Sequence, residues 1–417
     1  MGDNFIYPDL KDVKSEAKFI IDKGNKTISL IGGDTKVFDN TSTLPDQDTF
    51  YSGLSLGNDD VGRISIYKHD GTITTIQLAP NDVEFWLNGQ KVAKDQAKNV
   101  GEYDLRLTDD FINKVKSADG NNGNNYEWTY GTHTPSGDTT YTAIYKIYQA
   151  TGKAKLSGNN SKLYDGNAVT TADVNKDGKI TIDLTLPVYN PDDESQLLRT
   201  VPLGKYTLQD GDYTWNTADG SAPTKGGSYT ISLNKDKILS HLQDRLKTLA
   251  GVGTDPDSED PDNPTPMDNV TVSAEDLAGT ANYDINTSVS YQFIDNDNND
   301  SKVGAPVVVT GLNGESKDVS LVVPEGYELV DVLPTKATFG DINRTIRINL
   351  KHKKTSVDGR DHKDDNDIYR TVTRTITVNI EGQPTQVISQ KVSLYRIKTV
   401  DEALKAAGKP ESEYTTY

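Results

Sequence analysis

Two short acidic segments carry enough side-chain oxygen atoms to bind a divalent cation. Residues 173–180 read DVNKDGKI and offer oxygen ligands at Asp173, Asn175 and Asp177. This spacing matches the first eight positions of a helix–loop–helix calcium loop, in which alternate side chains surround one hard cation. The match fails at the twelfth position, where Leu184 replaces the acid that closes such loops. A polar turn is therefore the simpler interpretation, and we expect at most a weak effect of calcium.

The second segment, DNDNND at residues 295–300, could ligate calcium through Asp295 and Asp297. Short runs of Asp and Asn are also typical of solvated turns, because their side chains bond to the nearby backbone. Since the chain contains no Cys, thiolate metal sites and disulfides are excluded. We therefore expect no cofactor, with calcium as the one cation for which ligands are present.

Three aromatic residues, Tyr126, Trp128 and Tyr130, alternate with polar residues. In a β-strand, alternate side chains lie on one face, so the three rings would form a row. Such a row could stack on sugar rings and makes these residues the candidate ligand-binding site. The alternative is that the rings cover the helix of their own domain. Trp86 and Trp215 occupy similar places in an internal repeat, so we expect both in the core.

The sequence shows no arrangement that is typical of an enzyme. It contains no His-Glu-Xaa-Xaa-His motif and no phosphate-binding loop, and the Gly-Xaa-Ser-Xaa-Gly match at residues 53–57 is not marked out by a histidine or an acid as its partner. Carboxylates are numerous, but no pair is marked out for glycoside hydrolysis. The five histidines fall in unlike contexts, at His69, His133, His241, His352 and His362. The sequence thus favours a binding or structural role without catalysis.

Charge and hydropathy narrow the range of partners. The net charge of the 417 residues is −18. Nucleic acids and anionic membranes are bound through basic patches, so this charge argues against both. No apolar run is long enough to span a bilayer, and the first residues lack the pattern of a signal peptide. We expect a monomeric fragment without its own export signal or anchor.

An internal repeat organises the first two thirds of the chain. Residues 17–39 and 143–165 align at an offset of 126 (143 − 17), and the same offset relates 101–105 to 227–231. Each copy alternates apolar and polar residues around a turn and has one amphipathic helix near its end. Thr108 can cap the first helix, and Asn234 can cap the second.

This order of strands, one helix and a closing strand predicts a β-rich α+β fold. We expect an elongated tandem array of β-grasp-like modules, each a sheet with one helix. An acidic, Pro-rich stretch at residues 252–266 is either a loop inserted in the second copy or a linker, and the sequence leaves both open. Residues 319–323 and 345–350 alternate like strands, and the polar segment from His352 to Asp367 is expected to be a loop. Thr399 with Glu402 forms a capping-box pattern.

The expected domains follow from these patterns. They are a lead-in at 1–16, two repeats at 17–150 and 151–284, a third domain at 285–354, and the start of a further unit at 355–417 that looks truncated.

The third domain resembles a known family. The segments PEGYELV at 324–330, TFGD at 338–341 and NLKH at 349–352 are similar to the first half of Mub-type mucin-binding (MucBP) repeats of lactobacilli. TVTRTI at 371–376 resembles the start of the second half. The doubled N-terminal unit is similar to the MBG modules that often precede such repeats.

This resemblance implies an extracellular adhesin of a Gram-positive cell, anchored to the cell wall in its full length. The implied partners are host mucin or another glycoprotein and, in some members, immunoglobulins. Because the surface is acidic, contact with glycans must come from local donors and aromatic faces, multiplied by repetition. The alternative is a stalk that binds nothing and projects distal adhesive modules from the wall.

Overall fold

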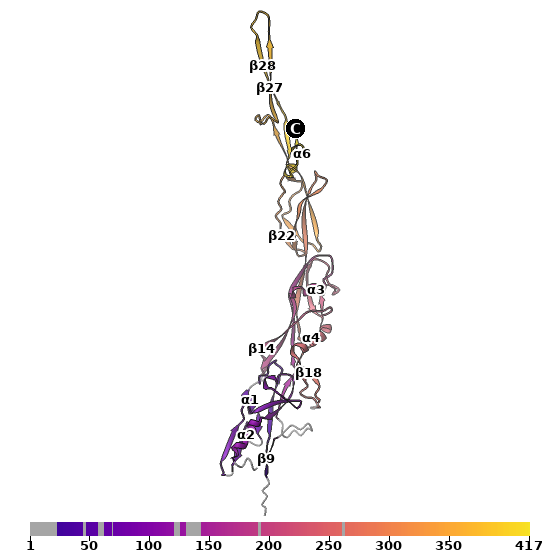
Figure 1. Ribbon diagram of the computed structural model, residues 1–417. Coiled ribbons are helices and arrows are strands. Elements are labelled where there is room, and N and C mark those ends of the chain that lie inside the picture. Colours follow the sequence, from indigo (N-terminus) through magenta and orange to yellow (C-terminus); the bar gives the residue numbers. More distant parts are fainter. Residues whose placement is uncertain are drawn as a thin grey trace, which may run out of the picture. The chain divides into compact units, whose positions relative to one another are not determined.

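The computed structural model describes residues 23–44, 47–56, 62–68, 70–120, 126–130, 143–190, 193–260 and 263–417. Strands dominate these residues and form several sheets, so the predicted β-rich character is confirmed (Figure 1). The chain divides into two compact units. The first takes its described residues from Met1–Lys155, Ile182–Tyr206 and Lys235–Ala278, and the second from Leu156–Thr181, Thr207–Asn234 and Gly279–Tyr417.

The first unit is built around the sheet β3-β2-β10-β8-β6-β7, in which β2 and β10 are parallel. Its elements are β1 (Gly24–Ile28), β2 (Leu30–Val37), α1 (Gln47–Ser52), β3 (Leu54–Leu56), β4 (Arg63–Tyr67), β5 (Ile73–Gln77), β6 (Val83–Leu87), β7 (Gln90–Val92), the 3-10 turn η1 (Lys94–Gln96), β8 (Gly101–Leu107), α2 (Asp109–Ala118), β9 (Tyr126–Tyr130), β10 (Ala143–Tyr148), β11 (Ala150–Thr151), β14 (Asp193–Tyr206), α4 (Lys235–Ala250), β17 (Val252–Thr254), β18 (Pro266–Asp268), β19 (Val270–Thr271) and η5 (Ala274–Asp276).

Aromatic rings fill the core of this sheet. Phe50, Phe85 and Tyr145 are buried, and the ring centroids of Phe50 and Tyr145 lie 5.5 Å apart in an edge-on arrangement. Edge-on aromatic pairs are favourable beyond the apolar area that they bury. The sheet is thus held by large side chains that arrive from widely separated parts of the sequence.

The second unit contains strands β15, β16, β21, β23 and β25 of the other large sheet. Its elements are α3 (Thr171–Asn175), η4 (Lys176–Gly178), β15 (Tyr213–Trp215), β16 (Gly227–Leu233), β21 (Ser301–Gly311), β22 (Ser316–Asp318), β23 (Tyr327–Leu329), β24 (Lys336–Thr338), β25 (Arg344–His352), β26 (Lys354–Asp358), β27 (Tyr369–Val378), β28 (Gln386–Tyr395), β29 (Ile397–Asp401), α5 (Glu402–Ala406), α6 (Glu411–Tyr414) and β30 (Thr415–Thr416). Three strands have residues in both units: β12 (Lys153–Leu163), β13 (Ile180–Asn190) and β20 (Leu277–Asp295).

The two repeats have the same strand order. The sheet of the second repeat follows β14-β13-β12-β20-β16-β15, and that of the first follows β3-β2-β10-β8-β6-β7. The five strands β13-β12-β20-β16-β15 match β3-β2-β10-β8-β6, and β14 and β7 are additional strands at the ends. The strands match in sequence position: β8 and β16 begin at Gly101 and Gly227, which are 126 residues apart (227 − 101). The prediction that both copies have one strand order is therefore confirmed.

The correspondence expected for the tryptophans is wrong by one residue. Trp215 pairs with Ile231, whose counterpart in the first repeat is Leu105 (231 − 126). Leu105 pairs with the buried Phe85, whereas its neighbour Trp86 is only partly buried. Because successive strand residues point to opposite faces, this shift of one residue moves Trp86 away from the core.

Both predicted helices form. The hydroxyl of Thr108 accepts a hydrogen bond from the backbone of Phe111, so the predicted cap of α2 is confirmed. In α4 the side chains of Ile238, Leu242 and Leu246 are buried on one face, as the spacing predicts. No helix in the described part of the chain combines the length and the apolar character that crossing a bilayer requires.

The acidic stretch is an insertion. Strands β17 and β18 pair as antiparallel neighbours, so the described residues between them, 255–260 and 263–265, lie in the loop of a hairpin. The chain then continues into β19, which pairs with β11. Of the two interpretations left open by the sequence, the loop is therefore the one observed.

The part of the second unit that follows residue 288 has its own core. Strand β20 continues there with β25 beside it in parallel and β21 antiparallel. The buried side chains of this core are Val289, Tyr291, Phe293, Ala337, Phe339, Ile348 and Leu350. Residues 319–323, predicted as a strand, are not one. Val319, Leu321 and Val323 still pack against the core, so alternation reflects packing here without strand pairing.

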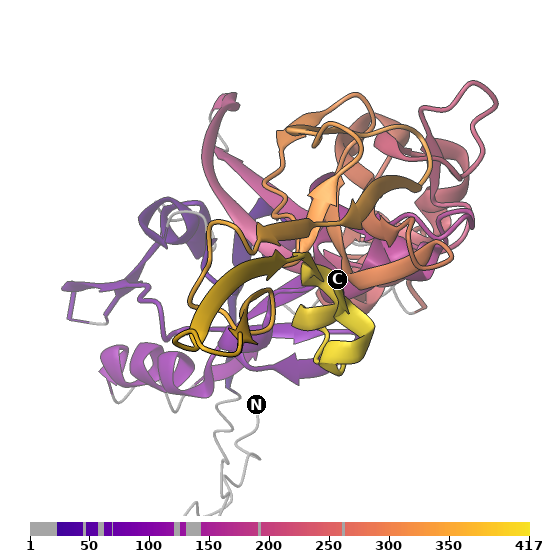
Figure 2. The ribbon, with the colours of Figure 1, turned by 90° about the horizontal axis from the view of Figure 1, so that it is seen from above.

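The C-terminal residues depart from two further predictions. Part of the segment from His352 to Asp367, expected as a loop, is strand: His352 ends β25, and β26 pairs with β29. Helix α5 is capped by Asp401, whose side chain accepts from the backbone of Ala403 and Leu404, and Thr399 lies within β29. Helices α5 and α6 are drawn in yellow in Figure 2.

Candidate functional site

The predicted aromatic row lies on a strand. Residues Tyr126–Tyr130 form β9, which pairs in parallel with β1, and Lys26 is the backbone partner of Trp128. Tyr126 is partly buried. The side chains of Trp128 and Tyr130 lie outside the described residues, so their role in ligand binding remains a prediction.

The oxygen ligands at Asp173, Asn175 and Asp177 do not converge. The Asp173 carboxylate accepts hydrogen bonds from the backbone and hydroxyl of Thr170, both 2.9 Å long, and forms a capping box for α3. These bonds to Thr170, first the backbone one, hold the pKa of Asp173 below its usual value despite partial burial. The side-chain amide of Asn175 donates a hydrogen bond of 2.8 Å to the backbone carbonyl oxygen of Leu208.

Asp177, the third of these residues, is exposed, and its φ of 61° turns the chain sharply. The segment therefore begins with a helical turn, whereas the backbone of a calcium loop would be open at the same positions. The signal for this was present in the sequence: a threonine three residues before an aspartate is a capping-box pattern, comparable to the usual one that ends in Glu or Gln.

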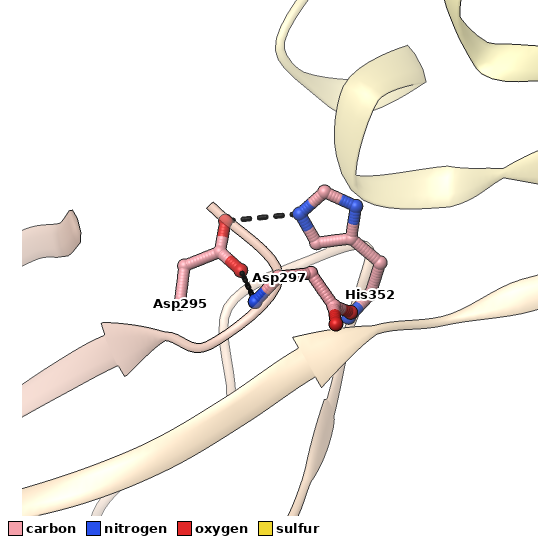
Figure 3. A group of neighbouring side chains, drawn as sticks. All are labelled: Asp295, Asp297 and His352. Carbon is pink, nitrogen blue, oxygen red and sulfur yellow. Dashed lines mark hydrogen bonds and ion pairs between the residues drawn. The ribbon is translucent and has the colours of Figure 1, made fainter. Parts of the chain in front are cut away.

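A different cluster gathers Asp295 and Asp297 with His352 (Figure 3). One ligand atom from each of these residues lies within 4.8 Å of the other two. Asp295 ends β20 and His352 ends β25, and the two strands are parallel neighbours in which Asp295 is the partner of Leu350. Strand pairing therefore brings together residues that are 57 positions apart in the sequence.

The imidazole ring of His352 is held from both sides. Its Nε2 lies 2.9 Å from Oδ2 of Asp295, and its Nδ1 lies 2.7 Å from Oδ2 of Asp401. The side chains of His352 and Asp295 are only 7% and 2% exposed, so this contact is shielded from water. Tyr327 stands edge-on to the ring and donates its hydroxyl to Asp295 at 3.4 Å.

Burial and charge act in opposite directions on this ring. Burial disfavours the imidazolium, but hydrogen bonds to Asp295 and Asp401, together with their negative charges, outweigh it and raise the pKa of His352. The turn is fixed as well, because Asp295 accepts from the backbone of Asp297, and Asp297 accepts from the backbone of His352 at 2.8 Å.

Sequence reasoning found the two aspartates and missed the other partners. His352 is the last residue of the segment NLKH. It is far from Asp295 in the sequence, so the sequence alone does not indicate that the two side chains are in contact. Asp401 was obscured because Thr399 was taken as the helix cap. The parallel pairing of β20 and β25 was the missing information, since a single strand pattern does not state which strand lies beside it.

A second feature is the hairpin of β27 and β28, a long two-stranded ribbon in Figure 1. Its strand residues include three cations, Arg370, Arg374 and Lys391, and no acid, although the chain as a whole has a net charge of −18. All of β28 and most of β27 are exposed.

The register divides the hairpin into two faces. One carries Arg370 and Arg374 among apolar residues, since Val372 pairs with Val392 and Ile376 with Ile388. The other face carries Lys391 and a row of hydroxyl side chains. These are Thr371, Thr373, Thr375, Thr377, Ser389 and Ser393. The hairpin thus offers hydrogen-bond donors and positive charge on an otherwise acidic chain.

Comparison with known proteins gives one family match. The sequence model of the MBG domain matches residues 25–145 and 151–287, more than half of the chain. No curated protein matches it.

Among solved structures, a cell surface adhesin from Lactobacillus reuteri is 25% identical over 32% of this chain and 94% of its own, with a TM-score of 0.16. The crystal structure of Mub-RV is 21% identical over 28% of this chain and 66% of its own, with a TM-score of 0.20. The Streptococcal High Identity Repeats in Tandem domains 3–4 from a cell surface protein are 8% identical over 48% and 98%, with a TM-score of 0.15. Scores this low carry no conclusion about the fold.

Proposed function

The chain belongs to the MBG domain family, and from this premise we propose that it is a non-enzymatic part of a bacterial surface adhesin that contacts host mucin or another host glycoprotein. The observation that carries the proposal is the tandem match of two MBG domains, at residues 25–145 and 151–287. Tandem modules make weak sites useful, because linked sites raise the effective concentration for each further contact. The implied location is extracellular, on a cell-wall-anchored protein.

The hairpin β27–β28 supports a contact with acidic glycoproteins. Sialylated and sulfated mucin glycans are anionic, and Arg370, Arg374 and Lys391 provide charge of the opposite sign without a carboxylate in either strand. Arginine can donate two parallel hydrogen bonds to a carboxylate or sulfate. Exposed charge pairs contribute little each, on the order of 1 kcal/mol or less, which fits binding by many weak contacts.

The aromatic strand Tyr126–Tyr130 is the other proposed contact. Stacking of a ring on an apolar sugar face contributes on the order of 1 kcal/mol, so a single strand would bind weakly. The Mub-like residues 288–350 are a third candidate on the basis of the family resemblance. A stalk that binds nothing is the competing function, and the same assay separates the two.

The test is retention of the full chain on immobilised purified mucin, compared with periodate-treated and desialylated mucin. We expect retention on native mucin that falls after either treatment and as salt increases. Absence of retention on native mucin at low salt would favour the stalk.

Variants then locate the contact. Arg370→Gln with Arg374→Gln should reduce retention several-fold, whereas Arg370→Lys with Arg374→Lys preserves the charge and should reduce it less. Trp128→Ala with Tyr130→Ala tests the aromatic strand in the same way. Circular dichroism of each variant shows whether its fold is intact. If all variants bind like the original chain, residues 288–350 are the next segment to change.

A further inference from the structure

The His352 ring faces two carboxylates, and this arrangement requires a positive species at the ring. A neutral imidazole carries one proton, and an ionised carboxylate only accepts hydrogen bonds. Nδ1 and Nε2 lie 2.7 Å and 2.9 Å from carboxylate oxygens. If a proton lies between Nδ1 and Asp401, then the lone pair of Nε2 points at Asp295. That contact is satisfied by a second proton, on Nε2 or on the carboxylate, or by a metal ion that both groups bind side by side.

We propose that Asp295, Asp297 and His352 form a binding site for a divalent transition-metal ion, with Nε2 of His352 as its nitrogen ligand. Asp401 is a positioning residue: by accepting from Nδ1 it fixes the tautomer and the orientation of the ring. A carboxylate behind the histidine is the usual arrangement around protein zinc, where it also makes the ring a stronger ligand.

The distances fit this site. Transition-metal ions bind nitrogen and oxygen at about 2.0–2.2 Å, which places neighbouring ligand atoms about 3–3.5 Å apart. The separation of 2.9 Å between Nε2 and Asp295 is already close to that value. Asp297 supplies a third ligand atom within 4.8 Å, and because this residue is exposed, a small rotation of its side chain can complete the approach. Water can take the remaining position.

The nitrogen ligand changes the ion expected at these aspartates. Calcium prefers a shell made of oxygen atoms, so a nitrogen ligand from His352 disfavours it. Imidazole with two carboxylates suits zinc, cobalt or nickel. A buried ring and a carboxylate that is 2% exposed also limit access of water to the ion, which strengthens its attraction to both.

The site connects three parts of the second unit. Asp295 and Asp297 belong to the turn after β20, His352 ends β25, and Asp401 caps α5. An ion that fixes the ring therefore also fixes the start of the C-terminal segment through Asp401. Ligand binding to the folded state alone stabilises that state, so the metal should raise the melting temperature of this unit.

The first test uses Co²⁺ as a spectroscopic probe on the full chain without an affinity tag. We expect one equivalent of Co²⁺ to bind with a visible absorption band, and Zn²⁺ to displace it and remove the band. Failure of the chain to bind either ion, at concentrations up to about 1 mM, overturns the proposal.

Variants show whether the ion lies at this ring. His352→Gln should abolish the Co²⁺ band, whereas His362→Gln, which changes an exposed histidine nearby in the sequence, should leave it unchanged. Asp401→Asn keeps the shape and removes the charge, and should weaken binding about 10- to 100-fold. Equal binding by His352→Gln and the original chain places the ion elsewhere and contradicts the proposal.

NMR of the original chain covers the case in which His352→Gln does not fold. Bound Co²⁺ should shift the His352 ring signals more than those of any other histidine. A ring that keeps a proton on both nitrogens in the presence of Co²⁺ and Zn²⁺ would mean that the second proton is the positive species, and the metal site would be disproved.

Discussion

The two repeats can be compared residue by residue, because positions 126 apart in the sequence are structurally equivalent in the two copies. Gly32 and Gly158 have φ values of 104° and 117°. A Cβ added at Gly32 would meet the carbonyl oxygen of Gly53 at 2.0 Å, and one added at Gly158 would meet that of Lys179, also at 2.0 Å. Residues 53 and 179 are again 126 apart (179 − 53). The close approach of these strands is therefore common to both copies.

The lysine pair shows where the copies differ. In the first repeat the Lys36 side chain is 5% exposed, and its ammonium donates to Asp39 at 3.0 Å and to the carbonyls of Thr41 and Thr43 at 2.7 Å and 3.0 Å. In the second, Lys162 is 12% exposed and its bonds to Asp165 and Asn167 are 3.3 Å and 3.2 Å long.

Burial lowers the pKa of Lys36 although Asp39 attracts its charge, so the desolvation of this ammonium outweighs its partner. The backbone geometry of the repeat is thus maintained more strictly than the polar contacts that surround it.

The glycines provide the strongest test of the equivalence. Gly32→Ala and Gly158→Ala should each lower the free energy of unfolding of their own sheet by about 3–5 kcal/mol, from backbone strain and overpacking together. Hydrogen exchange measured separately in β2 and β12 reports the two effects. Similar losses are expected, and a difference of more than about 2 kcal/mol would mean that the two glycine positions are not equivalent. Gly71→Ala, at a glycine with a φ of 81° and open space around its Cβ position, is the control that carries backbone strain without overpacking.

Sequence periodicity predicted strands and helices well, because it reports which residues face a core. It found the strand at residues 345–350, the buried face of α4 and the Thr108 cap. It failed where partners had to be known. The alternation at residues 371–380 resembles that of residues 289–293, yet Val289 is 1% exposed and Val372 is 45% exposed. Alternation gives the two faces of a strand but not whether anything covers them.

The candidate metal cluster likewise combines residues that the sequence pattern reveals with residues that only strand pairing reveals. The aspartates were evident from composition, because runs of Asp and Asn are visible in any sequence. His352 and Asp401 became part of the cluster only through the pairing of β20 with β25 and the position of α5. The single-residue error at Trp86 has a related cause, since an alignment of short strands does not fix their register to one residue.

The lysine pair should respond less strongly than the glycines. Lys36→Met removes a buried charge but leaves the carbonyls of Thr41 and Thr43 without this donor. Each orphaned acceptor costs about 1–3 kcal/mol, and release of the desolvated ammonium offsets part of that. We expect a net loss of about 2 kcal/mol for Lys36→Met and about half of it for Lys162→Met, measured by denaturant unfolding. A larger loss for Lys162→Met would contradict the ranking drawn from exposure and bond lengths.

The smallest expected effect belongs to the capping box of the second repeat. Asp173 there corresponds to Gln47 in the first repeat (173 − 126), so only the second copy has an ionisable group at this position. Because the pKa of Asp173 is lower in the folded state than its usual 3.8, its contribution is present above that value and disappears as pH falls through the folded-state pKa.

Asp173→Asn should therefore lower the free energy of unfolding by about 1 kcal/mol or less at neutral pH, which is the usual range for a cap. The difference from the original chain should stay constant above about pH 5 and shrink as the pH falls below 3.8. Unfolding curves at pH 3, 5 and 7 measure it, and Gln47→Asn, which changes no charge, is the matched control in the first repeat. A difference that grew in acid would have the wrong sign for a lowered pKa, and the cap would then not be the source of the stabilisation.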